Sequence, residues 1–152
     1  MKIAIGNDHR GYSAKCRLVS WLSAEGHEII DLGATNANDP TDYPDYAIPV
    51  AEMVARDEVF RGILICGTGI GMCIAANKVG GARAATCHDP LTAEISRRHN
   101  NSNILCMSAD LLGEELMDRL VQTWLSSEFD GGRHARRIDK ISQFEDNRSA
   151  LS

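Results

Sequence analysis

The chain has 152 residues, a formal net charge of −5 and 43% hydrophobic residues, which together favour a single globular domain over residues 1–152. The acidic total disfavours nucleic acid as a partner, because that binding mode needs a net basic surface. The sequence contains neither an apolar run of membrane-spanning length nor a signal-peptide pattern after Met1, so we expect a cytoplasmic protein with no membrane partner. Five cysteines without a CxxC pair argue against a disulfide framework, and most are expected to be small buried side chains.

Short apolar runs alternate with helical patterns along the whole chain. The runs predict buried strands at residues 2–5, 28–32, 62–66, 82–87 and 103–107, and apolar spacing predicts helices over residues 14–22, 45–57, 72–79, 89–99 and 113–129. The second helix should start near Asp45, because a helix tolerates Pro49 only in its first turn. This alternation predicts an α/β fold with a five-stranded parallel sheet between two helical layers.

A last helix, at residues 137–149, is polar apart from one thin apolar stripe, which suits packing on a neighbouring subunit.

Ligands of such sheets bind beyond the carboxyl ends of the strands. At this edge, Cys66 ends the third strand and is followed by the glycine-rich turn 67–71. The backbone N–H groups of such a turn and the positive N-terminal end of the helix that follows it favour a bound anion, and they also favour the thiolate form of a cysteine. Cys66 is therefore a candidate nucleophile or general base, the alternative being one more buried cysteine. The turn fits neither a dinucleotide fingerprint nor a Walker loop, which leaves an oxyanion-stabilising loop. No local ligand spacing supports a metal site built from Cys66, His9 and His99.

Three further polar segments each allow a functional and a purely structural interpretation. Asp8 could accept a hydrogen bond from a ligand hydroxyl and His9 could donate one to a phosphate, or the two could be a helix cap beside a surface histidine. His99 and Asn100 could supply a proton and orient a ligand, or His99 could complement a helix dipole. The cationic segment 133–137 suits a phosphate monoester, although such clusters are usually solvated.

Taken together, five motifs carry a resemblance to a known family. They read GNDHRGY, TDYPDYA, GILICGTGIGMCIAANKVGGARAA, SRRHNNSNIL and DGGRHARR, and the match runs from Lys2 to about Ile141. The chain resembles the ribose-5-phosphate isomerase B family, which also contains galactose-6-phosphate and allose-6-phosphate isomerases. The resemblance implies a Rossmann-like three-layer α/β/α sandwich that works without a metal or cofactor. It also implies a dimer or tetramer whose active sites lie between subunits.

The resemblance further implies a role for each matched residue. Cys66 would move a proton between carbons 1 and 2 of the open-chain sugar, while Thr68 and the turn amides stabilise the enediolate. His99 would open the sugar ring, and Asp8 would handle a sugar hydroxyl; His99 and Asn100 are expected from the neighbouring subunit. The remaining substrate-binding positions are His9, Tyr43, Gly67, Gly69, Ile70, Gly71, Asn100, Arg133, His134 and Arg137.

The expected reaction is the conversion of D-ribose 5-phosphate to D-ribulose 5-phosphate through a cis-enediolate, with Cys66 as the base. The sequence differs from the family pattern at one position, because Asp110 stands where the resemblance implies a phosphate-binding arginine in many members. Allose 6-phosphate, galactose 6-phosphate and erythrulose 4-phosphate therefore remain alternative substrates. Either Asp110 pairs with a nearby arginine or the substrate differs. A non-enzymatic sugar-phosphate-binding protein is a further alternative. A thiol redox protein would need a resolving partner for Cys66, and we expect Cys73 to be out of reach.

Overall fold

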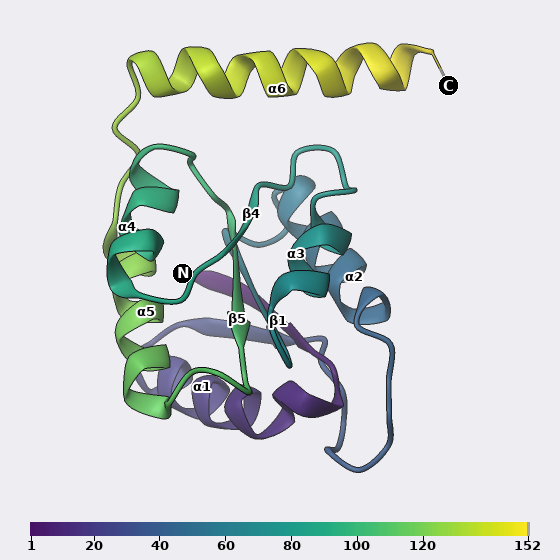
Figure 1. Ribbon diagram of the computed structural model, residues 1–152, viewed down its shortest axis with the longest axis vertical. Helices are drawn as coiled ribbons and strands as arrows, with labels where there is room; N and C mark the ends of the chain where they lie inside the picture. Colours follow the sequence, from purple (N-terminus) through teal and green to yellow (C-terminus); the bar gives the residue numbers. More distant parts are fainter. Residues whose placement is uncertain (152) are drawn as a thin grey trace.

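Five parallel strands form one sheet in the order β2-β1-β3-β5-β4, in a computed structural model that describes residues 1–151. The strands are β1 (Lys2–Asn7), β2 (Glu28–Asp31), β3 (Arg61–Cys66), β4 (Ala84–Thr86) and β5 (Ile104–Ser108). The helices are the 3-10 turn η1 (His9–Gly11), α1 (Tyr12–Ala24), α2 (Pro44–Ala55), α3 (Ile70–Ala76), α4 (Pro90–Arg98), α5 (Glu114–Ser126) and α6 (Arg133–Ala150). The predicted five-stranded parallel sheet is confirmed (Figure 1).

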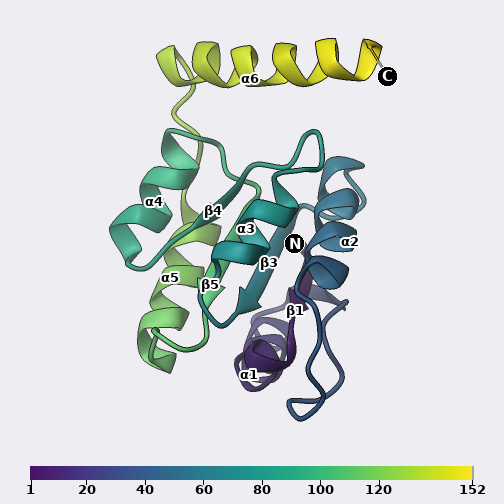
Figure 2. The same cartoon turned by 45° about the vertical axis from the view of Figure 1, so that its right-hand side comes forward.

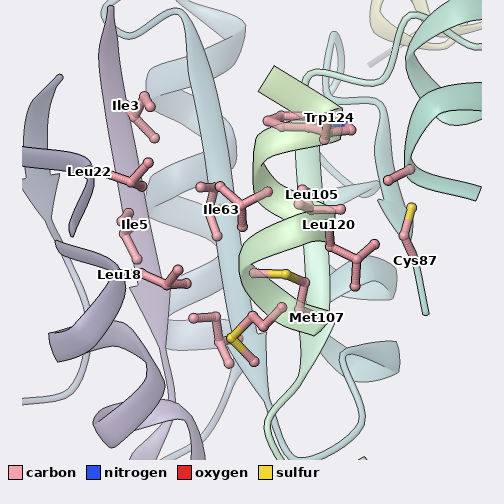
Figure 3. Packing of buried hydrophobic residues seen from close by; sticks show 14 residues of the cluster. Ile3, Ile5, Leu18, Leu22, Ile63, Cys87, Leu105, Met107, Leu120 and Trp124 are labelled. Atoms are coloured by element: carbon pink, nitrogen blue, oxygen red, sulfur yellow. The ribbon is translucent and has the colours of Figure 1, made fainter. Parts of the chain in front are cut away.

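Helices cover both faces of the sheet, which gives the three layers expected (Figure 2). Successive residues of a strand point to opposite faces, so Ile3 and Ile5 of β1 pack into one apolar cluster and Ala4 into the other. The first cluster contains Leu18 of α1, Ile63 of β3, Leu105 and Met107 of β5, and Trp124 of α5, as Figure 3 shows. The second cluster lies under α2 and α3. Burial on both faces explains why the strands read as continuous apolar runs.

The chain reverses direction across the sheet between β1 and β3. It passes from β1 to β2 on one side of β1 and returns to place β3 on the other side. In parallel sheets, ligands bind at such a switch point, beyond the carboxyl ends of the two strands. The turns after β1 and β3 therefore flank the expected binding crevice, and β5 brings a third turn beside them.

Two helices differ from the prediction. Helix α2 does begin next to Asp45, but Pro49 lies in its second turn rather than its first. It is tolerated there because this side of α2 is exposed, so the carbonyl group left without an N–H partner faces water. Helix α6 contains the predicted segment 137–149 but starts earlier, at Arg133. It lies at one end of the molecule, opposite the turns that follow β1 and β3 (Figures 1 and 2).

The five cysteines are all free and differ in exposure. Cys66, Cys87 and Cys106 are buried, as expected, and Cys73 is half-buried. The expectation of a buried side chain is wrong for Cys16, which is exposed because it lies on the solvent side of α1, next to the buried Lys15. None of the helices in residues 1–151 is both long and apolar enough to cross a membrane.

Candidate active site

The turn between β3 and α3 places the backbone N–H group of Gly69 against the Cys66 thiol. The Cys66 Sγ atom accepts a hydrogen bond from the Gly69 N–H group at 3.1 Å, and the thiol is buried. Gly69 has φ +79°, and a Cβ atom there would lie 2.9 Å from the backbone of Met107, so only glycine fits this position. The Thr68 side chain accepts from the Ile70 N–H group at 3.2 Å and is itself exposed. The turn thus holds the thiol against the Gly69 N–H group, with the Thr68 hydroxyl fixed nearby by the Ile70 N–H group.

Asp8 follows β1 directly and caps the 3-10 turn, which is the structural interpretation of this residue. Its Oδ1 atom accepts from the N–H groups of Arg10 at 3.0 Å and Gly11 at 3.2 Å. These bonds use only one of the two carboxylate oxygens. His9 is fixed by the loop after β2, because its Nδ1 atom accepts from the Thr41 N–H group at 3.1 Å. That bond leaves Nε2 as the ring nitrogen available to a ligand.

Tyr43 lies against the glycine turn from the other side. A Cβ atom at Gly71 would lie 2.8 Å from the Tyr43 ring, so the ring covers the start of α3. Tyr43 as a whole remains 40% exposed, so solvent or a ligand can reach it. The structure therefore brings Asp8, His9, Tyr43 and Cys66 with its turn to the same edge of the sheet.

Asp110, just after β5, pairs with an arginine, which was one of the two alternatives considered. The Arg10 Nε atom donates to both Asp110 oxygens at 3.1 and 3.0 Å, and Nη2 donates to Oδ1 at 2.9 Å. This hydrogen bonding raises the pKa of Arg10, so the guanidinium stays charged. The pair touches the glycine turn, because a Cβ atom at Gly67 would lie 3.0 Å from Asp110 Oδ2.

A second cluster of predicted site residues forms around the end of α4 and the start of α6. The rings of His99 and His134 stack with centroids 4.2 Å apart and planes 7° apart. Asp130 accepts from Arg98 Nε and Nη2, both at 3.1 Å, and this ion pair lowers the pKa of Asp130. Burial, followed by the charge of His99, lowers the pKa of His134. The lowered pKa favours the neutral form of His134, whose ring stacks on that of His99.

The ligand atoms of His99, Asp130 and His134 lie within 4.8 Å of one another, which is close enough to suggest a metal. The ring orientation argues against it, because the nitrogen lone pairs of parallel stacked rings run side by side instead of converging on one point. Arg98 also occupies both oxygens of Asp130. As arranged, these residues fit hydrogen bonding to a ligand better than coordination of a cation.

The two clusters lie at opposite ends of the same chain. Strands β1, β3 and β5 run toward the first cluster, whereas α4 runs back across the sheet and carries His99 to the other end (Figures 1 and 2). Asn100, Arg133 and Arg137 belong to this second end and are exposed. One chain therefore does not bring His99 to Cys66.

Cys73 is a thiol of altered acidity that was expected to be inert. A hydrogen bond with Cys106 is the main cause that lowers the pKa of Cys73 to about 6, while burial raises the pKa of Cys106. The Cys73 Sγ atom also contacts the Ala84 carbonyl at 3.4 Å and the Asn77 amide at 3.5 Å.

Two residues of these clusters were not singled out from the sequence, Arg10 and Asp130. The signal for Arg10 was available: a cation directly after Asp8 and His9, together with an acidic residue at position 110 that needs a partner. Asp130 stands within the quoted DGGRHARR motif, but nothing in the motif indicates its pairing with Arg98.

Comparisons with known proteins agree on one family over nearly the whole chain. The sequence profile described as Ribose/Galactose Isomerase matches residues 3–141. Ribose-5-phosphate isomerase B of Escherichia coli strain K12 is 46% identical over 148 residues, which is 97% of this chain and 99% of that protein. D-erythrulose-4-phosphate isomerase of Pectobacterium atrosepticum is 39% identical over 145 residues, 95% of each chain.

The fold leads to the same family. The structure of ribose-5-phosphate isomerase B from Clostridium thermocellum superposes with a TM-score of 0.94 at 48% identity, covering 97% of this chain and 99% of that one. A match of this extent in both sequence and fold establishes common descent rather than a shared architecture alone. This chain belongs to the Ribose/Galactose Isomerase family.

Proposed function

We propose that this protein interconverts an aldose phosphate and a ketose phosphate, with D-ribose 5-phosphate and D-ribulose 5-phosphate as its substrate pair. The observation that carries the proposal is the Cys66 thiol, buried at the end of β3 and bonded to the Gly69 N–H group at 3.1 Å. A carbon acid loses its proton only if the resulting oxyanion is stabilised, and a base next to directed N–H donors meets both needs.

In the proposed reaction, Cys66 in its thiolate form takes the proton from carbon 2 of the open-chain aldose. The electron pair moves to the carbonyl oxygen at carbon 1 and leaves a cis-enediolate, whose charge is stabilised by Thr68 and the amides of the turn 67–71. Cys66 then returns the proton to carbon 1, while the hydroxyl proton passes from oxygen 2 to oxygen 1. Asp8 binds a sugar hydroxyl through the carboxylate oxygen that is free of its capping bonds.

The proposed site needs a second copy of the chain. His99, which would open the sugar ring, lies at the opposite end of the sheet from Cys66, as do Asn100 and the phosphate-binding Arg133 and Arg137. We therefore propose a dimer or tetramer in which the neighbouring subunit supplies these residues. Because no metal or cofactor has a step in this reaction, none is assigned. Five free cysteines suit a reducing compartment, and we place the enzyme in the cytoplasm.

Helix α6 supplies the surface expected for that assembly. Ile141 is 53% exposed and Phe144 63% exposed on this helix, which is a large apolar area to leave in water. In the proposed assembly α6 packs this stripe on the neighbouring subunit, which brings Arg133 and Arg137 toward the neighbour's crevice.

The test of the base is exchange of the carbon-2 proton with solvent. Cys66→Ala should abolish this exchange and turnover while leaving the binding of inorganic phosphate nearly unchanged, because the loop and the cations remain. Cys16→Ala is the matched control, since it removes an exposed thiol of α1 and should leave turnover at the wild-type level. Near-normal turnover by Cys66→Ala would refute the assignment.

The ring-opening role of His99 is tested with two substrates. His99→Asn should reduce turnover of the cyclic sugar phosphate far more than turnover of an acyclic analogue, because only the former needs a proton on its ring oxygen. Equal losses on both substrates would argue against this role.

D-Erythrulose 4-phosphate is the second candidate substrate, since a relative 39% identical to this chain is an isomerase of that compound. A coupled assay with ribose 5-phosphate, allose 6-phosphate, galactose 6-phosphate and erythrulose 4-phosphate decides between them by kcat/KM. Binding of these compounds without any product would instead support a sugar-phosphate-binding protein.

A further inference from the structure

The Arg10–Asp110 pair lies on the glycine turn without a part in the reaction described above. Its two residues are 100 positions apart in the sequence. They meet because β1 and β5 lie on either side of β3 in the sheet, so the turns after these two strands both border the turn after β3. A Cβ atom at Gly67 would lie 3.2 Å from Cδ and Nε of Arg10 and 3.0 Å from Asp110 Oδ2, so the pair touches the residue next to Cys66.

Asp110 holds one edge of the guanidinium and leaves the other available. The hydrogen bonds to Asp110 use Nε and Nη2, and within residues 1–151 the Arg10 Nη1 group donates to no protein acceptor. A guanidinium has five N–H donors, so those on Nη1 can reach an anion while the opposite edge stays fixed. The Arg10 side chain is 56% exposed, so a ligand can approach it.

We propose that Arg10, aligned by Asp110, binds the phosphate group of the substrate through its Nη1 edge. Asp110 is then a positioning residue, because it acts through Arg10. This inference rests on the proposed function for the identity of the ligand. In this arrangement the turn after β1 supplies a cation to the phosphate site, and the acidic residue at position 110 holds that cation in place.

The alternative is that the pair is only a structural link between two turns. In that case the charge of Arg10 is already neutralised by Asp110. Substituting Arg10 would then leave the Asp110 carboxylate unpaired, but no contact with phosphate would be lost. The two cases differ in whether the effect of substituting Asp110 on phosphate affinity depends on the presence of Arg10. A double-mutant cycle of four proteins measures this dependence.

The experiment compares the wild type, Arg10→Gln, Asp110→Ala and the double variant, each checked for an unchanged circular dichroism spectrum. Inorganic phosphate is the calorimetric probe, and KM and kcat are measured with ribose 5-phosphate. Arg10→Gln should weaken phosphate binding and raise KM by about tenfold to a hundredfold, the range for a hydrogen bond to a charged group, with a smaller change in kcat. Arg56→Gln, an exposed arginine that pairs with Glu52 at the end of α2, is the matched control and should change neither.

The sign of the Asp110→Ala effect tests the positioning role. With Arg10 present, Asp110→Ala should weaken phosphate binding, because the guanidinium loses its anchor. In the Arg10→Gln background the same change should tighten binding, because only the repulsion between carboxylate and phosphate is removed. The same sign in both backgrounds would overturn the positioning role, and unchanged phosphate affinity in Arg10→Gln would overturn the proposal. Calorimetry gives these answers even if no sugar phosphate is converted, a result that would refute the proposed function instead.

Discussion

Replacing Gly69 by alanine tests how the turn after β3 is held in place. Gly69 has φ +79°, and for an L-residue this left-handed conformation costs about 1–2 kcal/mol. The new Cβ atom would also lie 2.9 Å from the Met107 carbonyl carbon, a contact with rigid backbone that forces the turn to move. Overpacking of this kind costs about 1–3 kcal/mol, so the free energy of unfolding should fall by about 2–5 kcal/mol in total.

Two other glycines separate these contributions. Gly26 has φ +88° with no atom within 4 Å of its Cβ position, so Gly26→Ala should cost only the conformational part, about 1–2 kcal/mol. Gly80 has neither a positive φ nor a close neighbour, so Gly80→Ala should change stability by less than about 0.5 kcal/mol. Urea unfolding at one fixed protein concentration measures all three, because oligomers gain stability with concentration.

The same substitution should also lower activity. The Gly69 N–H group donates to Cys66 Sγ, so a shift of the turn breaks the contact that the proposed base makes. We expect Gly69→Ala to lose most of its turnover while Gly26→Ala and Gly80→Ala keep theirs. If Gly69→Ala is no less stable than Gly26→Ala, the contact with Met107 does not fix the turn and the reasoning is wrong.

Three further predictions concern the core and the titrating groups. Trp124→Phe removes the bond from Nε1 to Ser102 Oγ at 2.8 Å and should lower the free energy of unfolding by about 1 kcal/mol in urea titrations. Burial lowers the pKa of His134, so the unfolded chain binds a proton first and the free energy of unfolding should fall as pH drops below about 6.5. Between pH 7.5 and pH 5.5 the melting temperature of His134→Asn should therefore fall less than that of the wild type. An equal fall in both proteins would contradict this prediction. Iodoacetamide at pH 7 should alkylate Cys73, with its pKa of about 6, faster than Cys106, as peptide mass spectrometry can measure, and the reverse order would refute the assignment.

The centre of the sheet was predictable because β1, β3 and β5 are covered on both faces, whereas the edge strands β2 and β4 are only partly buried. Burial on two sides requires a continuous apolar run, and such runs stand out between helical patterns. The positions of Cys66, Asp8 and His9 followed from the same pattern, since each lies at or just beyond the carboxyl end of a strand. The resemblance added the roles of these residues but not their contacts.

Contacts between distant segments were harder to predict, because they depend on which strands are neighbours. The alternation of strands and helices does not give the order β3-β5-β4, and only that order brings Asp110 to Gly67 and Arg10. Pro49 shows a different limit: a local rule placed it in the first turn, whereas the exposed side of α2 lets the helix keep it in the second.

The distance between the two clusters has a consequence for how substitutions act. If each active site takes Cys66 from one chain and His99 from another, a variant lacking Cys66 and a variant lacking His99 are both inactive alone but can rescue each other. In a mixed dimer, one site carries both defects and the other carries neither. With free exchange of subunits, half of the dimers are mixed, so about a quarter of all sites would regain activity. A change in α6 would likewise alter a reaction carried out on the neighbouring chain, and dilution that separates the chains would silence every site at once.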